Sequence, residues 1–122
     1  MNSLIVTAAL TGAFNLACSG TETVTKEGKV EQHGYAELYR VDLVSRRWCN
    51  AACGSLEPVA ALSPDEIVLV DSETSAGIVR NKVDRRSGAH VAEVKVAFVD
   101  YALTRQGRCA VRGFSGFPGG RR

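Results

Sequence analysis

The cysteines are the residues whose type and spacing most clearly allow chemistry. They are Cys18, Cys49, Cys53 and Cys109. A thioredoxin-like redox motif needs two cysteines separated by two residues, whereas three residues separate Cys49 from Cys53. A zinc site would need two further ligands close to that pair, and His33 and His90 each stand alone in the sequence. We therefore expect no metal and no cofactor.

Disulfide bonds are the other use of these thiols, and four cysteines allow three pairings. A Cys49–Cys53 bond would close a short local loop, and a Cys18–Cys109 bond would join the first predicted strand to the last. In the loop-entropy description the long link contributes about 4–5 kcal/mol and the short link about 2 kcal/mol. We predict that all four residues form structural disulfides, and the sequence leaves the pairing open.

Candidate catalytic residues are few. Ser115 lies in Gly113-Phe114-Ser115-Gly116, where the second glycine is one position too early for a nucleophile elbow and no strand-turn-helix pattern surrounds it. His33 lies in a polar segment, and His90 begins a predicted strand. We predict no catalytic residue and no enzyme. A hydrolase that uses either histidine with a neighbouring carboxylate is the less favoured alternative.

Charged residues point to turns and solvated edges. Asp65, Glu66, Asp71 and Glu73 flank an apolar segment, but calcium loops need denser oxygen ligands and a glycine at a fixed position. The 122-residue chain has 15 Lys+Arg against 13 Asp+Glu, a net charge of +2 that the final Arg121-Arg122 pair accounts for. Without a wider basic field, nucleic acid is not an expected partner.

The first 17 residues carry no charged side chain, and residues 4–10 form an apolar run. This run has the length of a signal-peptide core and is too short to span a membrane. We interpret residues 1–17 as a signal peptide, with small residues for cleavage at Thr11 and Ala13 or at Asn15 and Ala17. A buried first strand or helix is the alternative. Lipid attachment at Cys18 would leave an odd number of cysteines and is disfavoured.

Residues 18–122 read as a single domain of short strands separated by turn signals. The pattern predicts an all-β fold, a small antiparallel barrel or sandwich of about seven short strands linked by disulfides. Candidate strands cover 21–25, 35–43, 67–70, 78–84, 89–99 and 101–109, and a short or irregular strand surrounds Pro58. In 35–43, alternation places Tyr35, Glu37, Tyr39, Val41 and Leu43 on the inner face.

The connecting segments are read from glycine, proline and polar residues. Residues 26–34 and 71–77 are predicted to be polar loops, although the first of these could also form a poor strand. Residues 85–88 are predicted to form a hairpin turn, with Gly88 placed for a positive φ. The dipeptide Val41-Asp42 recurs as Val83-Asp84, each near an arginine pair, which is too short to count as a repeat. From about residue 110 a glycine-rich tail carries Phe114 and Phe117, which we expect to pack back on the domain.

Three segments together resemble a group of small exported bacterial proteins. They are the start Cys18-Ser19-Gly20-Thr21, the run Tyr39-Arg40-Val41-Asp42-Leu43 continuing to Arg47-Trp48-Cys49, and the ending Gly107-Arg108-Cys109 with Phe114-Ser115-Gly116-Phe117-Pro118. The resemblance covers most of residues 18–118. It implies export and a β-rich domain, and it brings no activity and no catalytic residues.

These features predict an exported protein, periplasmic or secreted, with no transmembrane segment and a monomeric state. The expected role is non-enzymatic binding of a protein or a small ligand, because small antiparallel barrels can hold one ligand. A periplasmic hydrolase inhibitor is the alternative, in which the tail with Phe114 and Phe117 would form the interaction loop. An open cavity would favour ligand carriage, and a packed core with an exposed aromatic loop would favour docking.

Overall fold

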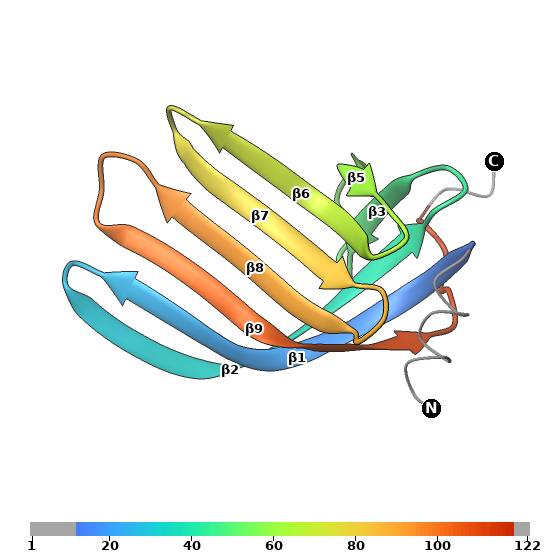
Figure 1. Ribbon diagram of the computed structural model, residues 1–122, viewed down its shortest axis with the longest axis horizontal. Coiled ribbons are helices and arrows are strands. Elements are labelled where there is room, and N and C mark those ends of the chain that lie inside the picture. The colour runs from blue at the N-terminus through green and yellow to red at the C-terminus, as the bar shows by residue number, and fades with distance from the viewer. Residues whose placement is uncertain (1–11, 119–122) are drawn as a thin grey trace.

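The computed structural model describes residues 12–118, which form a single antiparallel sheet. The strands are β1 (Ala13–Lys26), β2 (Lys29–Asp42), β3 (Arg47–Asn50), β4 (Glu57–Pro58), β5 (Ala61–Leu62), β6 (Glu66–Thr74), β7 (Gly77–Asp84), β8 (Ala89–Val96) and β9 (Tyr101–Arg112). Their spatial order is β4-β3-β2-β1-β9-β8-β7-β6-β5. The sheet curls into an open half-barrel (Figure 1). The predicted all-β antiparallel class is confirmed.

The predicted barrel or sandwich of about seven short strands needs correction, because this part of the chain forms nine strands in one curled sheet. The largest error is the loop predicted at 26–34. Only Glu27 and Gly28 form a turn there, and their positive φ values of 52° and 79° fit the two-residue hairpin that joins β1 to β2. Residues 71–74 likewise belong to β6 rather than to a loop. Both segments are polar because they extend beyond the core.

Side chains from both ends of the strand order fill one half of the inner face, which we call the closed half. Trp48 of β3 donates an Nε1–H hydrogen bond of 3.1 Å to the carbonyl of Leu69 in β6. The core around it contains Phe14, Leu16, Tyr39, Val41, Leu43, Ile67, Leu69 and Val83. Tyr39 and Val41 are buried as the alternation of 35–43 predicts.

The remaining part, the open half, ends at three linked turns. The Glu27 amide donates to the Asp100 carbonyl at 3.1 Å, and the Ala97 amide donates to the Ala76 carbonyl at 2.9 Å. In Figure 1 the long strands β1, β2, β9, β8, β7 and β6 run side by side into this half. Within residues 12–118, the inner face of the open half therefore has no covering element like the one that β3 provides in the closed half.

Two disulfides join the cysteines, Cys18–Cys109 and Cys49–Cys53, which is one of the three pairings that the sequence leaves open. Cys18 and Cys109 are directly opposite each other in the register of β1 and β9. Next to this bond, Gly20 faces Gly107. A Cβ atom on either glycine would collide with the backbone of the neighbouring strand, so the close approach at this point requires glycine.

Two turns share one capping arrangement. Asp42 Oδ1 accepts hydrogen bonds from the amides of Val44 and Ser45, and Asp84 Oδ1 accepts them from Arg86 and Ser87. Four residues after each aspartate the backbone has a positive φ, at Arg46 (58°) and Gly88 (80°). The hairpin turn predicted at 85–88 is confirmed, and the short Val-Asp recurrence marks two equivalent turns.

The N-terminal part of β1 belongs to the folded domain. Phe14 and Leu16 are 2% and 1% exposed and lie in the core. Cleavage after Ala17 would remove both, whereas cleavage after Ala13 would leave them in place. Residues 1–11, the greater part of the predicted signal peptide, lie outside the described residues. Residues 12–118 include no helix that could cross a membrane.

Candidate functional site

A row of charged side chains lies on the inner face where the closed half meets the open half. Arg105 of β9 donates to Glu22 Oε1 of β1 at 2.7 Å and to Glu37 Oε1 of β2 at 3.4 Å. Its guanidinium also lies 5.0 Å from the ring centroid of Tyr35. Arg105 is partly buried, so its charge is neutralised by two carboxylates and an aromatic face rather than by water alone.

A chain of hydrogen bonds between uncharged side chains continues from this row into the core. The Tyr35 hydroxyl lies 2.6 Å from His90 Nδ1, and His90 Nε2 lies 2.9 Å from Asn81 Oδ1. Asn81 Nδ2 in turn donates to the Tyr39 hydroxyl at 3.0 Å. Because the Asn81 oxygen accepts only, the proton of a neutral His90 lies on Nε2, and Tyr35 donates to Nδ1.

His90 is a buried, neutral imidazole in this network. Burial lowers the pKa of His90 from 6.5 to about 4, and the charge of Arg105 acts in the same direction. Both ring nitrogens are engaged by Tyr35 and Asn81, and neither partner is a carboxylate. The sulfur atoms of Cys18 and Cys109 lie next to the ring, but the disulfide leaves neither as a thiolate ligand. The geometry fits a structural histidine.

We predict that His90→Gln flattens the pH dependence of stability. In the wild-type protein His90 binds a proton near pH 6.5 when unfolded but only near pH 4 when folded, so stability falls as the pH is lowered through this window. The loss at about pH 4.5 is about 2–3 kcal/mol. Urea denaturation at neutral pH and at about pH 4.5 measures it, with the exposed His33→Gln as control. An unchanged pH dependence in His90→Gln would contradict the assignment.

The other sequence candidates do not form a catalytic arrangement in the described residues. His33 Nε2 lies 3.8 Å from Glu22 Oε2, beyond hydrogen-bond distance. Ser115 accepts a hydrogen bond from Asn15 and contacts no histidine. The acidic residues around β6 pair with cations: Arg86 with Asp65, Lys82 with Glu66, and Arg80 with both Asp71 and Glu73. These carboxylates neutralise neighbouring side chains.

An apolar band crosses the inner face of the open half, one step beyond the charged row. It consists of Val24, Leu103, Val94 and Val79, which are consecutive partners in the registers of β1, β9, β8 and β7. Val79 is 40% exposed, and the other three are half-buried. Beyond the band, Val96 faces Tyr101 and is 41% exposed. Aliphatic side chains thus form a continuous strip on a surface that no second layer of the described residues covers.

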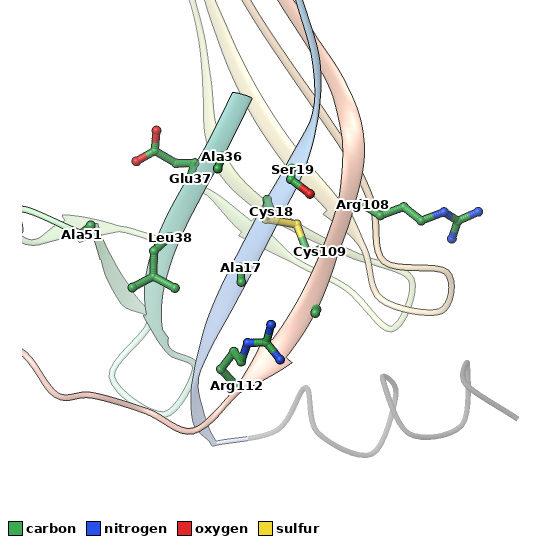
Figure 2. Close-up of a pocket in the computed structure, with 11 residues that line it drawn as sticks. Ala17, Cys18, Ser19, Ala36, Glu37, Leu38, Ala51, Arg108, Cys109 and Arg112 are labelled. Atoms are coloured by element: carbon green, nitrogen blue, oxygen red, sulfur yellow. A yellow bond between two sulfur atoms is a disulfide. The ribbon is translucent and has the colours of Figure 1, made fainter. Parts of the chain in front are cut away.

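The outer face carries a separate shallow hollow of about 740 Å³ beside β2. Alanines and Leu38 line much of it: Ala17, Ala36, Leu38 and Ala51 are labelled in Figure 2, and Ala110 also borders it. The Cys18–Cys109 disulfide lies between β1 and β9 at its centre, and Arg108 and Arg112 lie on its β9 side. The hollow adjoins Ala36 and Leu38, near the free part of β2.

Comparison with known proteins identifies no relative of this chain. No family model, no curated protein and no solved structure matches this chain. Any functional assignment therefore depends on the geometry described above.

The aromatic residues of the two loops differ in exposure. Phe114 and Phe117 stack edge to face at 5.2 Å and are half-buried, while Ser115 bonds Asn15 and the Gly116 carbonyl accepts from Arg40. The part of the tail that carries Phe114 and Phe117 therefore lies against the domain, as expected. Among residues 12–118 the exposed aromatic side chain is that of Phe98 in the β8–β9 turn, which is 94% exposed. Sequence alternation predicts that Phe98 belongs to a strand, because the pattern of apolar residues at Val94 and Val96 continues to Phe98.

Proposed function

We propose that this protein is an exported, non-enzymatic binding domain whose ligand carries an aliphatic chain. The ligand would lie across the apolar band formed by Val24, Leu103, Val94 and Val79. The observation that carries the proposal is the exposure of this band on a concave face that residues 12–118 leave uncovered. Two structural disulfides support export, because such bonds persist in oxidising compartments.

The packing of the closed half determines where a ligand would lie. Leu16, Ile67, Leu69 and Val83 are each no more than 1% exposed, so this half is filled by its own side chains. A ligand would therefore bind on the open half of the sheet rather than inside the core. The charged row of Glu22, Arg105 and Glu37 limits the band on one side, since an aliphatic chain that displaced water from these groups would gain nothing.

Removing one aliphatic side chain from the band should weaken binding. Val94→Asn places an amide in the middle of the band, and we expect it to lower the affinity for a dansyl-labelled undecanoate about tenfold or more, in line with the cost of losing one buried valine contact. Fluorescence titration of the full chain measures this change.

Val91→Asn is the matched control, because Val91 lies on the same strand, points to the outer face and is 42% exposed. The two substitutions carry a similar loss of strand propensity. Equal affinities of the two variants, or failure of the wild-type protein to bind the probe, would sink the proposal.

A second candidate is docking to another protein, as in the hydrolase-inhibitor alternative, but through the β8–β9 turn instead of the tail with Phe114 and Phe117. Phe98 is 94% exposed and the neighbouring Val99 is 59% exposed. Two adjacent exposed apolar residues at the tip of a hairpin resemble an anchor that inserts into a partner. Phe98→Ser distinguishes the candidates, because it removes this anchor and leaves the apolar band intact.

A further inference from the structure

We infer that two copies of this chain pair through the free edge of β2, antiparallel and with His33 at the two-fold axis. The proposal is independent of ligand binding on the apolar band. It concerns residues 29–37, which carry strand hydrogen-bonding groups and charged side chains at one border of the half-barrel.

The free edge results from the shortness of β3. Within the described residues β3 pairs with β2 only from Tyr39 to Asp42. The Cys49–Cys53 loop then ends β3 at Asn50, so β2 continues from Leu38 back to Lys29 with a strand neighbour on its β1 side alone. An edge of this length is a template for another strand.

The hairpin geometry fixes which groups of β2 point outward. In a two-residue hairpin the residues flanking the turn, Lys26 and Lys29, form a hydrogen-bonded pair. Odd-numbered residues of β2 therefore bond to β1, and the N–H and C=O groups of Val30, Gln32, Gly34 and Ala36 point away from it. A second β2 strand running antiparallel can bond to these groups when its even-numbered residues face them.

Several two-fold registers allow the even-numbered residues of the two copies to face each other. The charged side chains favour one of these registers. When His33 of one copy faces His33 of the other, Lys29 of each copy faces Glu37 of its partner. The dimer then contains two such ion pairs, and the whole segment 29–37 is paired. Moving the axis to Gly34 would place Glu31 opposite Glu37, and like charges directly opposite each other destabilise a sheet. Moving the axis to Gln32 pairs a shorter segment and gives up the contact between Lys29 and Glu37.

The register with His33 opposite His33 would also relieve two unfavourable features of the single chain. Lys26 and Lys29 are directly opposite each other, and a Glu37 carboxylate from the second copy would lie beside them. On the outer face, Val30 is 64% exposed and would face Ala36, which borders the hollow of Figure 2. Glu37 meets Arg105 through one long contact of 3.4 Å, which leaves it able to accept a second cation.

The opposite border of the sheet is less suited to self-pairing. Beyond its contact with β5, the β6 edge carries Asp71 and Glu73. Two such edges would bring acidic residues of both copies together. The edge of β2 instead carries both signs of charge in complementary positions.

A charge-swap experiment tests the pairing on the full chain. Sedimentation velocity over a concentration series should show a wild-type dimer. Lys29→Glu and Glu37→Lys should each weaken it about tenfold to thirtyfold, because each creates two like-charge pairs across the axis. The double variant should restore wild-type affinity. Lys95→Glu is the control, since it reverses the charge of an exposed lysine on β8, which pairs with β7 and β9 and does not border this edge.

A cysteine scan tests the register. His33→Cys should form an intermolecular disulfide readily, because residues facing each other in a non-hydrogen-bonded pair have the shortest Cβ separation. Gln32→Cys on the same edge should crosslink much more slowly. A wild-type monomer at about 500 µM, a double charge variant no tighter than the single ones, or faster crosslinking at position 32 would each overturn the proposal.

Discussion

Replacing both Cys18 and Cys109 with alanine should lower the free energy of unfolding by about 4–5 kcal/mol. The bond closes a loop with a sequence separation of 91 residues, and it joins β1 to β9 at the middle of the strand order. For a domain of this size the loss corresponds to a decrease in Tm of about 15–30 °C. Thermal unfolding in non-reducing buffer, followed by circular dichroism, measures it.

The Cys49→Ala and Cys53→Ala double variant is the matched control. This bond spans a sequence separation of 4 residues, so its loss should cost only about 2 kcal/mol. Both variants remove two sulfurs, and Cys18, Cys49 and Cys109 are all buried, so cavity effects enter both measurements. If the two double variants lost the same stability, the role of Cys18–Cys109 as the main covalent constraint would be contradicted.

The second large effect is expected from Trp48→Ala, about 3–5 kcal/mol of destabilisation. Trp48 is 9% exposed and contacts the ring of Tyr39 edge to face at 5.7 Å. Its Nε1–H bond to Leu69 is the contact that joins β3 to β6 across the closed half. Truncation therefore removes a large buried side chain and also leaves the Leu69 carbonyl without this donor. Urea denaturation followed by circular dichroism gives the change.

Two further variants separate these contributions. Trp48→Phe keeps much of the apolar volume and removes the donor, so it should cost about 1–3 kcal/mol. Phe98→Ala removes an aromatic side chain that is 94% exposed and should change stability little. A cost below about 1 kcal/mol for Trp48→Ala would mean that Trp48 does not close this half of the sheet.

Sequence patterns predict the fold best where one face of a strand is buried. Alternation identifies the inner face of 35–43, because Tyr39 and Val41 contact the core while Arg40 points away. The same reasoning fails at 29–34, where Val30, Glu31 and His33 are all exposed and no face differs from the other. Strand formation there depends on pairing with β1, which is a tertiary effect.

The candidate site is only partly visible in the sequence. Alternation places Val94 on the same side of its strand as His90 and Ala92, which indicates one of the four members of the apolar band. The remaining members, Val24, Leu103 and Val79, join it through the registers between strands. One partner of His90, Tyr35, lies 55 residues away in the chain, whereas the other, Asn81, lies 9 residues away on the neighbouring strand β7. Local patterns carry no information on such pairings.

Mapping a bound ligand by NMR tests the proposed function most directly. Backbone amide spectra of the ¹⁵N-labelled full chain would be recorded during titration with dodecanol, an uncharged aliphatic chain. The proposal predicts saturable shifts that cluster at Val24, Val79, Val94 and Leu103, with the core amides of Ile67 and Val83 unchanged. Shifts confined to the outer-face hollow around Ala36 and Leu38, or no saturable shift at all, would contradict it.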